Sequence, residues 1–245
     1  MIVEACVDTL QSARAAAAGG ANRIELCDNL ADGGTTPSHG VAAIAAAELA
    51  IPVVAMLRPR GGTFVCDADD LTVMRADARL LRDSGVAGVA LGVLTADGAI
   101  DTAAIAQFRD LLPDADLTFH RAFDVCRDAP AALEALIVLG VDRVLTSGQQ
   151  ATAWEGRGAI AELVGQAGDR ITILAGGSID EHNAAALIRA TGVREIHVRG
   201  TRVERSTMQF HDTPVPFRRP LPADESLRSV TDAARVAAIC AAARG

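Results

Sequence analysis

Short apolar runs alternate with helix-like segments along this chain. Four of these runs predict strands at residues 2–6, 52–58, 116–120 and 170–175. Four more strands follow a repeated phrase, a glycine with Ala or Val, two variable residues and an apolar residue, which begins at Gly20, Gly85, Gly140 and Gly192. Each glycine follows a helix-like stretch and can end it in the left-handed conformation, so that the apolar residue starts the next strand.

The alternation of eight strands with helices predicts the α/β class and a single (β/α)8 TIM barrel with eight parallel strands. The length of 245 residues suits one such domain. A doubly wound sheet would place a G-x-G-x-x-G turn after its first strand, where this chain reads CVDT at residues 6–9. We therefore expect one barrel over residues 1–245, with an irregular loop at about 201–222 and a final helix at about 231–243.

Strand alternation indicates which side chains share a face. Residues five and seven positions after the repeat glycines lie on the face of Glu25, and they include Cys27, Ser147, His197 and Arg199. Helices cover the outside of a parallel barrel with apolar contacts. A face that carries carboxylates should therefore point inward, near the mouth where barrel enzymes place their chemistry.

Two carboxylates and two thiols are expected to meet at this mouth. Glu4 and Cys6 lie two residues apart on the first strand, as do Glu25 and Cys27 on the second. If the two strands are neighbours, the like charges of Glu4 and Glu25 are close together and the pKa of one should rise. Such a carboxyl group can serve as an acid or a base.

Two histidines extend this acid–base set. His120 ends the fifth expected strand and His197 lies in the eighth. His120 could be a general base or a metal ligand, or a buried neutral ring satisfied by the backbone. The candidate catalytic residues are Glu4, Glu25, His120 and His197.

Other strand ends could hold a small anion. Arg58 combines a guanidinium with the nearby amides of Gly61 and Gly62, a set that suits a carboxylate or phosphate, although Arg58 could instead pair with a mouth carboxylate. The glycines after the seventh strand could bind phosphate or form a tight turn. Asp124 is expected to orient its neighbours rather than react. The candidate substrate-binding residues are Arg58, Arg121, Asp124, Ser147, Gly176 and Gly177.

Cys6 and Cys27 are the candidate metal ligands. Thiolates select soft ions such as Cu(I) or zinc, and two thiols alone underfill a tetrahedral zinc site, which favours Cu(I). The alternative is a pair of small, inert core cysteines. The five cysteines form an odd set without finger-like spacing, so a disulfide framework is not expected.

Charge and hydropathy limit the partners. The formal net charge of −8 argues against nonspecific nucleic-acid binding, which needs a basic surface. No apolar run approaches the roughly 20 residues of a membrane span, and a strand-like run stands where a leader would be. We expect a cytoplasmic protein that binds neither nucleic acid nor membrane.

Several segments together resemble the CutC family of copper homeostasis proteins. They are EAC at 4–6, GGANRIELC at 19–27, GGTTPS at 33–38, RPRGG at 58–62, TFHRAFD at 118–124 and VLTSG at 144–148. The resemblance implies a cytoplasmic TIM barrel, commonly a homo-oligomer, with a Cu(I) site at the cysteines that match Cys6 and Cys27.

The chain departs from this family after the histidine of its eighth strand. The family usually has a small Ser-Ala pair there, whereas this chain has Val198, Arg199 and Gly200, and residues 201–222 also match poorly. Two functional classes follow. One is a Cu(I)-binding homeostasis protein. The other is a barrel enzyme with acid–base chemistry on a small anionic substrate, phosphorylated or sugar-like. The enzyme is considered because a copper carrier needs thiolates but not the surrounding acid–base groups.

Overall fold

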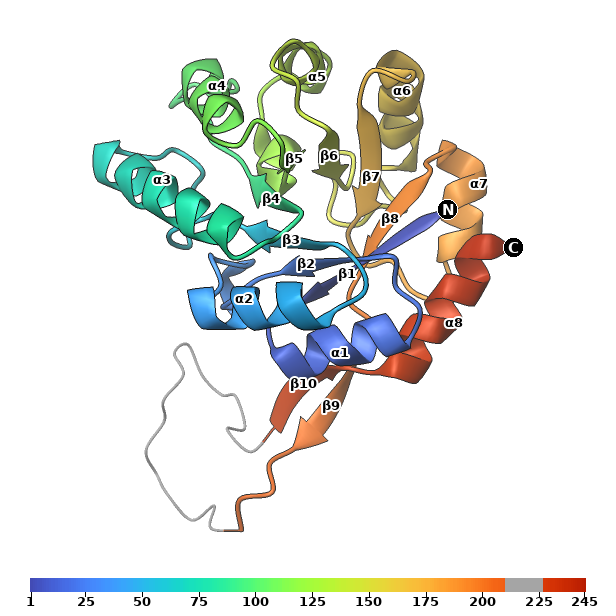
Figure 1. The fold of residues 1–245 in the computed structure, drawn as a ribbon. Coiled ribbons are helices and arrows are strands. Elements are labelled where there is room, and N and C mark those ends of the chain that lie inside the picture. Colours follow the sequence, from blue (N-terminus) through green and yellow to red (C-terminus); the bar gives the residue numbers. More distant parts are fainter. Residues whose placement is uncertain (210–226) are drawn as a thin grey trace.

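Eight parallel strands form a closed barrel (Figure 1). The computed structural model describes residues 1–209 and 227–245. The strands are β1 (Ile2–Val7), β2 (Arg23–Leu26), β3 (Val53–Met56), β4 (Gly88–Leu91), β5 (Asp116–Phe119), β6 (Arg143–Thr146), β7 (Thr172–Gly176) and β8 (Glu195–Val198). Each strand pairs with the next, and β8 pairs with β1 to close the ring. The predicted (β/α)8 barrel is confirmed.

In the part of the chain that the structure describes, eight helices surround this ring (Figure 1). They are α1 (Leu10–Ala18), α2 (His39–Glu48), α3 (Ala68–Asp83), α4 (Thr102–Leu111), α5 (Ala129–Val138), α6 (Arg157–Ala167), α7 (Ala184–Thr191) and α8 (Ala233–Arg244). Two short 3-10 helices, η1 (Leu30–Asp32) and η2 (Arg121–Val125), follow β2 and β5. Within the described ranges, we find no helix with the length and apolar character that crossing a membrane requires.

The four repeat glycines all adopt the left-handed conformation. Their φ angles are 87° at Gly20, 81° at Gly85, 67° at Gly140 and 72° at Gly192, a region where side chains with a Cβ are strained. Each glycine ends a helical segment just before an even-numbered strand. The repeat therefore marks the junctions into β2, β4, β6 and β8, as the sequence predicts.

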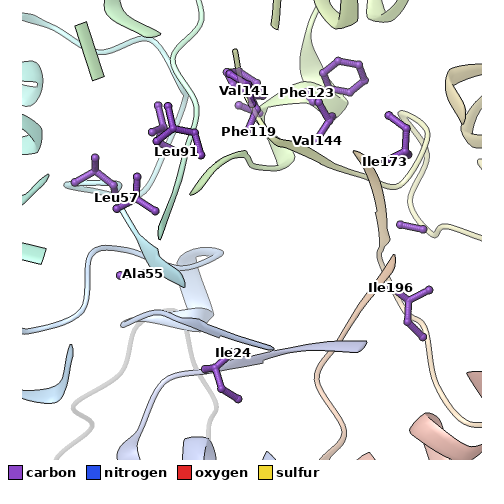
Figure 2. Close-up of a cluster of buried hydrophobic side chains, with 14 of the residues drawn as sticks. Ile24, Ala55, Leu57, Leu91, Phe119, Phe123, Val141, Val144, Ile173 and Ile196 are labelled. Carbon is purple, nitrogen blue, oxygen red and sulfur yellow. The ribbon is translucent and has the colours of Figure 1, made fainter. Parts of the chain in front are cut away.

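The main hydrophobic core lies between the strands and the helices. In Figure 2, Ile24, Leu91, Ile173 and Ile196 point outward from the ring of strands, towards the surrounding helices. The opposite faces of the strands form the barrel interior. A small separate cluster there contains Cys6, Cys27, Val54, Met56 and Ala90. The two cysteines thus pack inside the barrel, whereas the aliphatic core lies outside it.

A two-stranded antiparallel ribbon projects from the barrel next to α1 (Figure 1). It pairs β9 (Thr201–Arg205) with β10 (Leu227–Thr231). The irregular loop predicted at 201–222 therefore begins with a strand, because pairing with a distant segment is not visible in the local sequence. Residues 210–222 of that prediction lie outside the described residues. The predicted final helix corresponds to α8.

Candidate functional site

The inward faces of the even strands follow the repeat glycines in register. The third residue after each glycine is Arg23, Gly88, Arg143 or Glu195, and the fifth is Glu25, Ala90, Leu145 or His197. TIM barrels fill their interior with such layers of four side chains from alternate strands. The third-residue layer contains both positively and negatively charged side chains. It lies beneath the layer of Glu25 and His197, further from the barrel mouth.

Ion pairs in this lower layer balance the buried Glu4. Arg23 donates from Nε to Glu4 and from Nη2 to Glu195. Arg143 donates to Asp116 over 2.6 Å, and its Nε lies 3.3 Å from Glu195 without forming a hydrogen bond. A buried carboxylate is costly unless it is paired and hydrogen-bonded. Arg23 therefore allows Glu4 to remain ionised with only 1% of its surface exposed.

Glu4 and His197 form a tightly hydrogen-bonded pair across the seam that closes the barrel. His197 Nδ1 lies 2.8 Å from Glu4 Oε1. Burial alone would raise the pKa of Glu4, but the hydrogen bond from His197 and the charge of Arg23 lower it to about 2. Burial opposes charging of His197, but the Glu25, Cys6 and Glu4 groups around it raise its pKa well above the ordinary value. The pair is thus carboxylate and imidazolium at neutral pH.

The pKa of Glu25 is shifted in the opposite direction to that of Glu4. Burial, with the negative charges of Cys6 and Glu4, raises the pKa of Glu25 well above its ordinary value, although His197 opposes this shift. Its Oε2 lies 3.7 Å from His197 Nε2, too far for a strong ion pair, and its Oε1 is buried without a hydrogen-bond partner in the described part of the chain. Glu25 is therefore the more readily protonated of the two carboxyl groups, so the predicted divergence of their pKa values is present.

The thiols of Cys6 and Cys27 approach each other inside the same interior. Their Sγ atoms lie 4.0 Å apart, and Cys27 Sγ lies 3.5 Å from Glu25 Oε2. The hydrogen bond from Cys27, helped by His197, lowers the pKa of Cys6 well below the usual thiol value against the effect of burial. The same hydrogen bond, with burial, raises the pKa of Cys27. Cys6 is therefore the thiol of the pair that loses its proton more readily, and Cys27 is the one that keeps it.

Arg58 organises the loops that cover these thiols. Its guanidinium donates to the backbone carbonyls of Asp32 (2.8 Å), Gly34 (2.9 Å) and Gly62 (2.9 Å), and it stacks on the ring of Phe64. The pairing with Glu25 or another carboxylate, which the sequence left open, is not found among the described residues. Four of its five N–H groups are on Nη1 and Nη2, which bind these carbonyls. The fifth is on Nε, which is buried and has no partner among residues 1–209 and 227–245.

His120 lies within the barrel mouth as a neutral ring. Its Nδ1 accepts a hydrogen bond of 3.2 Å from the Ala122 amide, and its Nε2 has no partner among the residues that the structure describes. Burial and the nearby charge of Arg58 lower the pKa of His120 to about 3. The ring packs beside Phe64 and Phe119. This arrangement corresponds to the buried neutral alternative, with one N–H still unsatisfied.

Arg121, Asp124 and Ser147 form one connected group after β5 and β6. Asp124 accepts hydrogen bonds from the Ser147 amide at 2.9 Å and from Arg121 Nε at 2.7 Å. Arg121 Nη2 also donates to Ser147 Oγ at 2.7 Å, and that hydroxyl donates to the Gln150 carbonyl at 2.6 Å. Asp124 and Ser147 therefore position loops, as expected for Asp124, while Arg121 is half exposed at the mouth.

Gly176 and Gly177 leave room for His197 and for the neighbouring loops because they have no side chain. A Cβ on Gly176 would lie 3.2 Å from His197 Cβ and 2.6 Å from a Leu145 methyl. Gly177 has a φ of 116° and accepts a hydrogen bond from the Ala153 amide. The turn thus exists, and it borders a pocket that also contains His197 and Arg199.

Sequence reasoning missed Arg23 and Glu195, which complete the charge balance around Glu4. The repeat contained the signal, because the third position after each glycine shares the inward face of the fifth and seventh. It also missed Asp8, whose pKa is raised by burial at the same mouth.

Comparison with known proteins assigns the family. The CutC family model matches residues 1–202. The chain belongs to the CutC family. It is 40% identical over 243 residues to the human copper homeostasis protein cutC homolog, a match that covers 99% of this chain and 89% of the human one. It is 42% identical over 243 residues to a CutC family protein of Mesorhizobium japonicum, covering 99% and 94% of the two chains.

A solved structure agrees with this assignment. The CutC protein of Streptococcus agalactiae superposes with a TM-score of 0.77 at 36% identity, over 81% of this chain and 98% of the other. Because relatives of this chain are named copper homeostasis proteins, the interior side chains that could bind a metal ion are of particular interest. Two overlapping sets have ligand atoms all within 4.8 Å of one another, namely Cys6, Glu25 and Cys27, and Glu4, Glu25 and His197. The first set contains the soft donors that fit Cu(I).

Proposed function

We propose that this CutC-family protein binds one Cu(I) ion between Cys6 and Cys27 as its cargo in copper homeostasis. The observation that carries the proposal is the 4.0 Å separation of the two sulfurs. An ion about 2.3 Å from each sulfur, the length of a zinc–thiolate bond, would see them about 120° apart. This angle leaves room for a third ligand, and the Glu25 carboxyl group is next to Cys27.

The charges around the sulfurs suit a monovalent soft cation. The lowered pKa of Cys6 favours its thiolate, whereas Cys27, whose pKa is raised, must lose its proton to become the second thiolate. Two thiolates and Cu(I) then carry one net negative charge, which the neighbouring His197 imidazolium offsets. Binding should therefore release one proton, and the apparent affinity should rise with pH.

Anaerobic Cu(I) titration against a competing chelator tests this proposal. We expect one ion per chain in the wild type and none in the Cys6→Ser, Cys27→Ser double variant. Cys240→Ser is the matched control, because Cys240 lies on α8 and its thiol donates to the Gly20 carbonyl, a bond that serine can keep. Equal stoichiometry in the wild type and the double variant would exclude the two cysteines as the site.

All five cysteines are free thiols, which is usual in a reducing compartment and supports the cytoplasm as the location of this chain.

A homo-oligomer, implied by the family resemblance, is also part of the proposal. Size-exclusion chromatography with light scattering would measure the number of subunits.

A second candidate function is acid–base catalysis on a small anionic, phosphorylated or sugar-like substrate. It is favoured by the array of Glu4, His197 and Glu25, which a metal carrier does not need. Glu25 would be the acid because its pKa is raised, and Glu4 would hold His197 as an imidazolium that orients the substrate. His120 would donate a hydrogen bond from Nε2, because its other ring nitrogen is already used.

The enzyme proposal requires a substrate screen before variants are compared. Turnover would be sought across sugar phosphates and small organic acids with the metal-free protein. Glu25→Gln should then reduce the rate about 10²–10⁴-fold, the usual contribution of a general acid, while Cys27→Ser should have a smaller effect. A substrate turned over equally by wild type and Glu25→Gln would remove Glu25 from the chemistry.

A further inference from the structure

A pocket of about 370 Å³ opens where the loops after β7 and β8 meet, beside His197. Its lining includes Arg121, Gly177, Ser178, Asp180, His197 and Arg199. This volume is within the usual range for small-molecule sites. The position is also where many TIM barrels bind phosphate, with the loops that follow strands 7 and 8.

Cations dominate this pocket although the whole chain carries a net charge of −8. Three arginines line it, and Asp180 is its one carboxylate among the described residues. Arg121 pairs with Asp124, and Arg235 pairs with Glu181 at 3.1 Å. Arg199 differs from both, since it has no hydrogen bond or ion pair with any residue in the described ranges and its side chain is exposed, although its charge opposes the rise that burial causes in the pKa of the nearby Asp8. Its guanidinium is available to a ligand.

Backbone donors accompany this free guanidinium. Within the parts of the chain that are described, the amides of Gly177, Ser178 and Ile179 donate to no backbone or side-chain acceptor. Ser178 adopts a φ of 56°, which is unusual for a residue with a side chain. The segment is held in place, because Asn183 donates to the Ser178 carbonyl at 2.8 Å and Ala153 donates to the Gly177 carbonyl at 3.0 Å. Three consecutive amides beside a cation form a set that suits an oxyanion.

We propose that this pocket binds the phosphate group of a small phosphorylated molecule, with Arg199 and the amides of residues 177–179 as its donors. A phosphate offers enough acceptor oxygens for a planar guanidinium and several amides at once. The body of the molecule would extend along the pocket towards His197. This site shares no ligand with the sulfur pair, so it stands whether or not the chain binds Cu(I) or catalyses a reaction.

Calorimetric titration of the metal-free full-length chain with ribose 5-phosphate, in buffer without phosphate or sulfate, tests the site. Ribose is the uncharged control, and inorganic phosphate is the competitor. We expect ribose 5-phosphate to bind, ribose not to bind, and phosphate to compete. Arg199→Ala should weaken binding at least about tenfold, the loss expected for one charge-assisted pair. Arg194→Ala is the matched control, because Arg194 precedes the same strand at the opposite barrel end and pairs with Asp169.

The remaining outcomes are equally decisive. Equal weakening by Arg194→Ala and Arg199→Ala would show nonspecific attraction to the surface and overturn the proposal. Absence of binding by both phosphates at millimolar concentration would also overturn it. Unchanged phosphate binding in the Cys6→Ser, Cys27→Ser variant is expected, and its loss there would show that the anion occupies the thiol site instead.

Discussion

Arg58 holds Gly34 over the thiol of Cys27. The Arg58 guanidinium donates to the Gly34 carbonyl at 2.9 Å, and a Cβ built on Gly34 would come within 3.2 Å of Cys27 Sγ. Leu30, from the same loop, packs against the cluster that contains both cysteines. The loop between β2 and α2 is thus the cover of the sulfur pair, and Arg58 fastens it to the loop after β3 through Gly62.

Removing this fastening should expose the thiols. In a background where Cys66, Cys126 and Cys240 are replaced by serine, Arg58→Ala should react with an aromatic disulfide reagent at least about tenfold faster than the parent. The reason is the loss of hydrogen bonds from a charged group, each worth about 1.5–3 kcal/mol. Arg60→Ala is the control, since Arg60 is exposed and pairs with Asp70. Equal labelling rates in folded Arg58→Ala and parent protein would contradict the assignment of a cover.

Glu4 should make folding stability depend on acid pH. Its pKa falls from 4.5 to about 2 in the folded protein, so its contribution is complete above pH 4.5 and is lost as the pH falls towards 2. The stability difference between the wild type and Glu4→Gln should shrink by about 2 kcal/mol from pH 6 to pH 3. Urea denaturation across this range measures it. A difference that does not change with pH would mean that Glu4 is not held as a carboxylate.

Gly92 should be intolerant of a side chain because His120 fills the space beside it. An added Cβ would lie 2.5 Å from two atoms of the His120 ring and 2.8 Å from Ala122 Cβ. Gly92→Ala should cost about 1–3 kcal/mol of unfolding free energy, as is usual for an overpacked core. The matched control is Gly158→Ala in α6, where a Cβ meets nothing within 4 Å and should add about 0.5–1 kcal/mol. Comparable effects of the two substitutions would be inconsistent with this packing.

The two histidines of the mouth should differ in charge at the same pH. His120, with a pKa of about 3, should remain neutral with its proton on Nε2 between pH 5 and pH 8, and His197, whose pKa is raised well above 6.5, should still be cationic at pH 6.5. Ring nitrogen chemical shifts measured by NMR distinguish these forms, with His120→Asn and His197→Asn used for assignment. An imidazolium spectrum for His120 at pH 6 would refute the buried neutral ring.

Much of the fold could be read from local patterns in the chain. The glycines at 20, 85, 140 and 192 need a left-handed backbone wherever the helix before a strand ends, and this requirement belongs to the residue itself. Strand alternation likewise assigns Glu4, Cys6, Glu25 and Cys27 to one face, because side chains two apart on a strand point the same way. Both properties depend on neighbours along the sequence, and both predictions are confirmed by the barrel.

The chemistry of the interior depended on contacts between distant strands. Glu4 meets His197 only because β8 closes against β1, across 193 positions of sequence. The protonation of Glu25, the neutral state of His120 and the use of Arg58 on carbonyl groups follow from burial and from which partners come within about 3 Å. The same holds for Arg199, because only the fold determines that it lines the pocket beside His197 without an ion pair among the described residues. Electrostatic free energy depends on distance and solvent exposure, and only the closed barrel sets those two quantities.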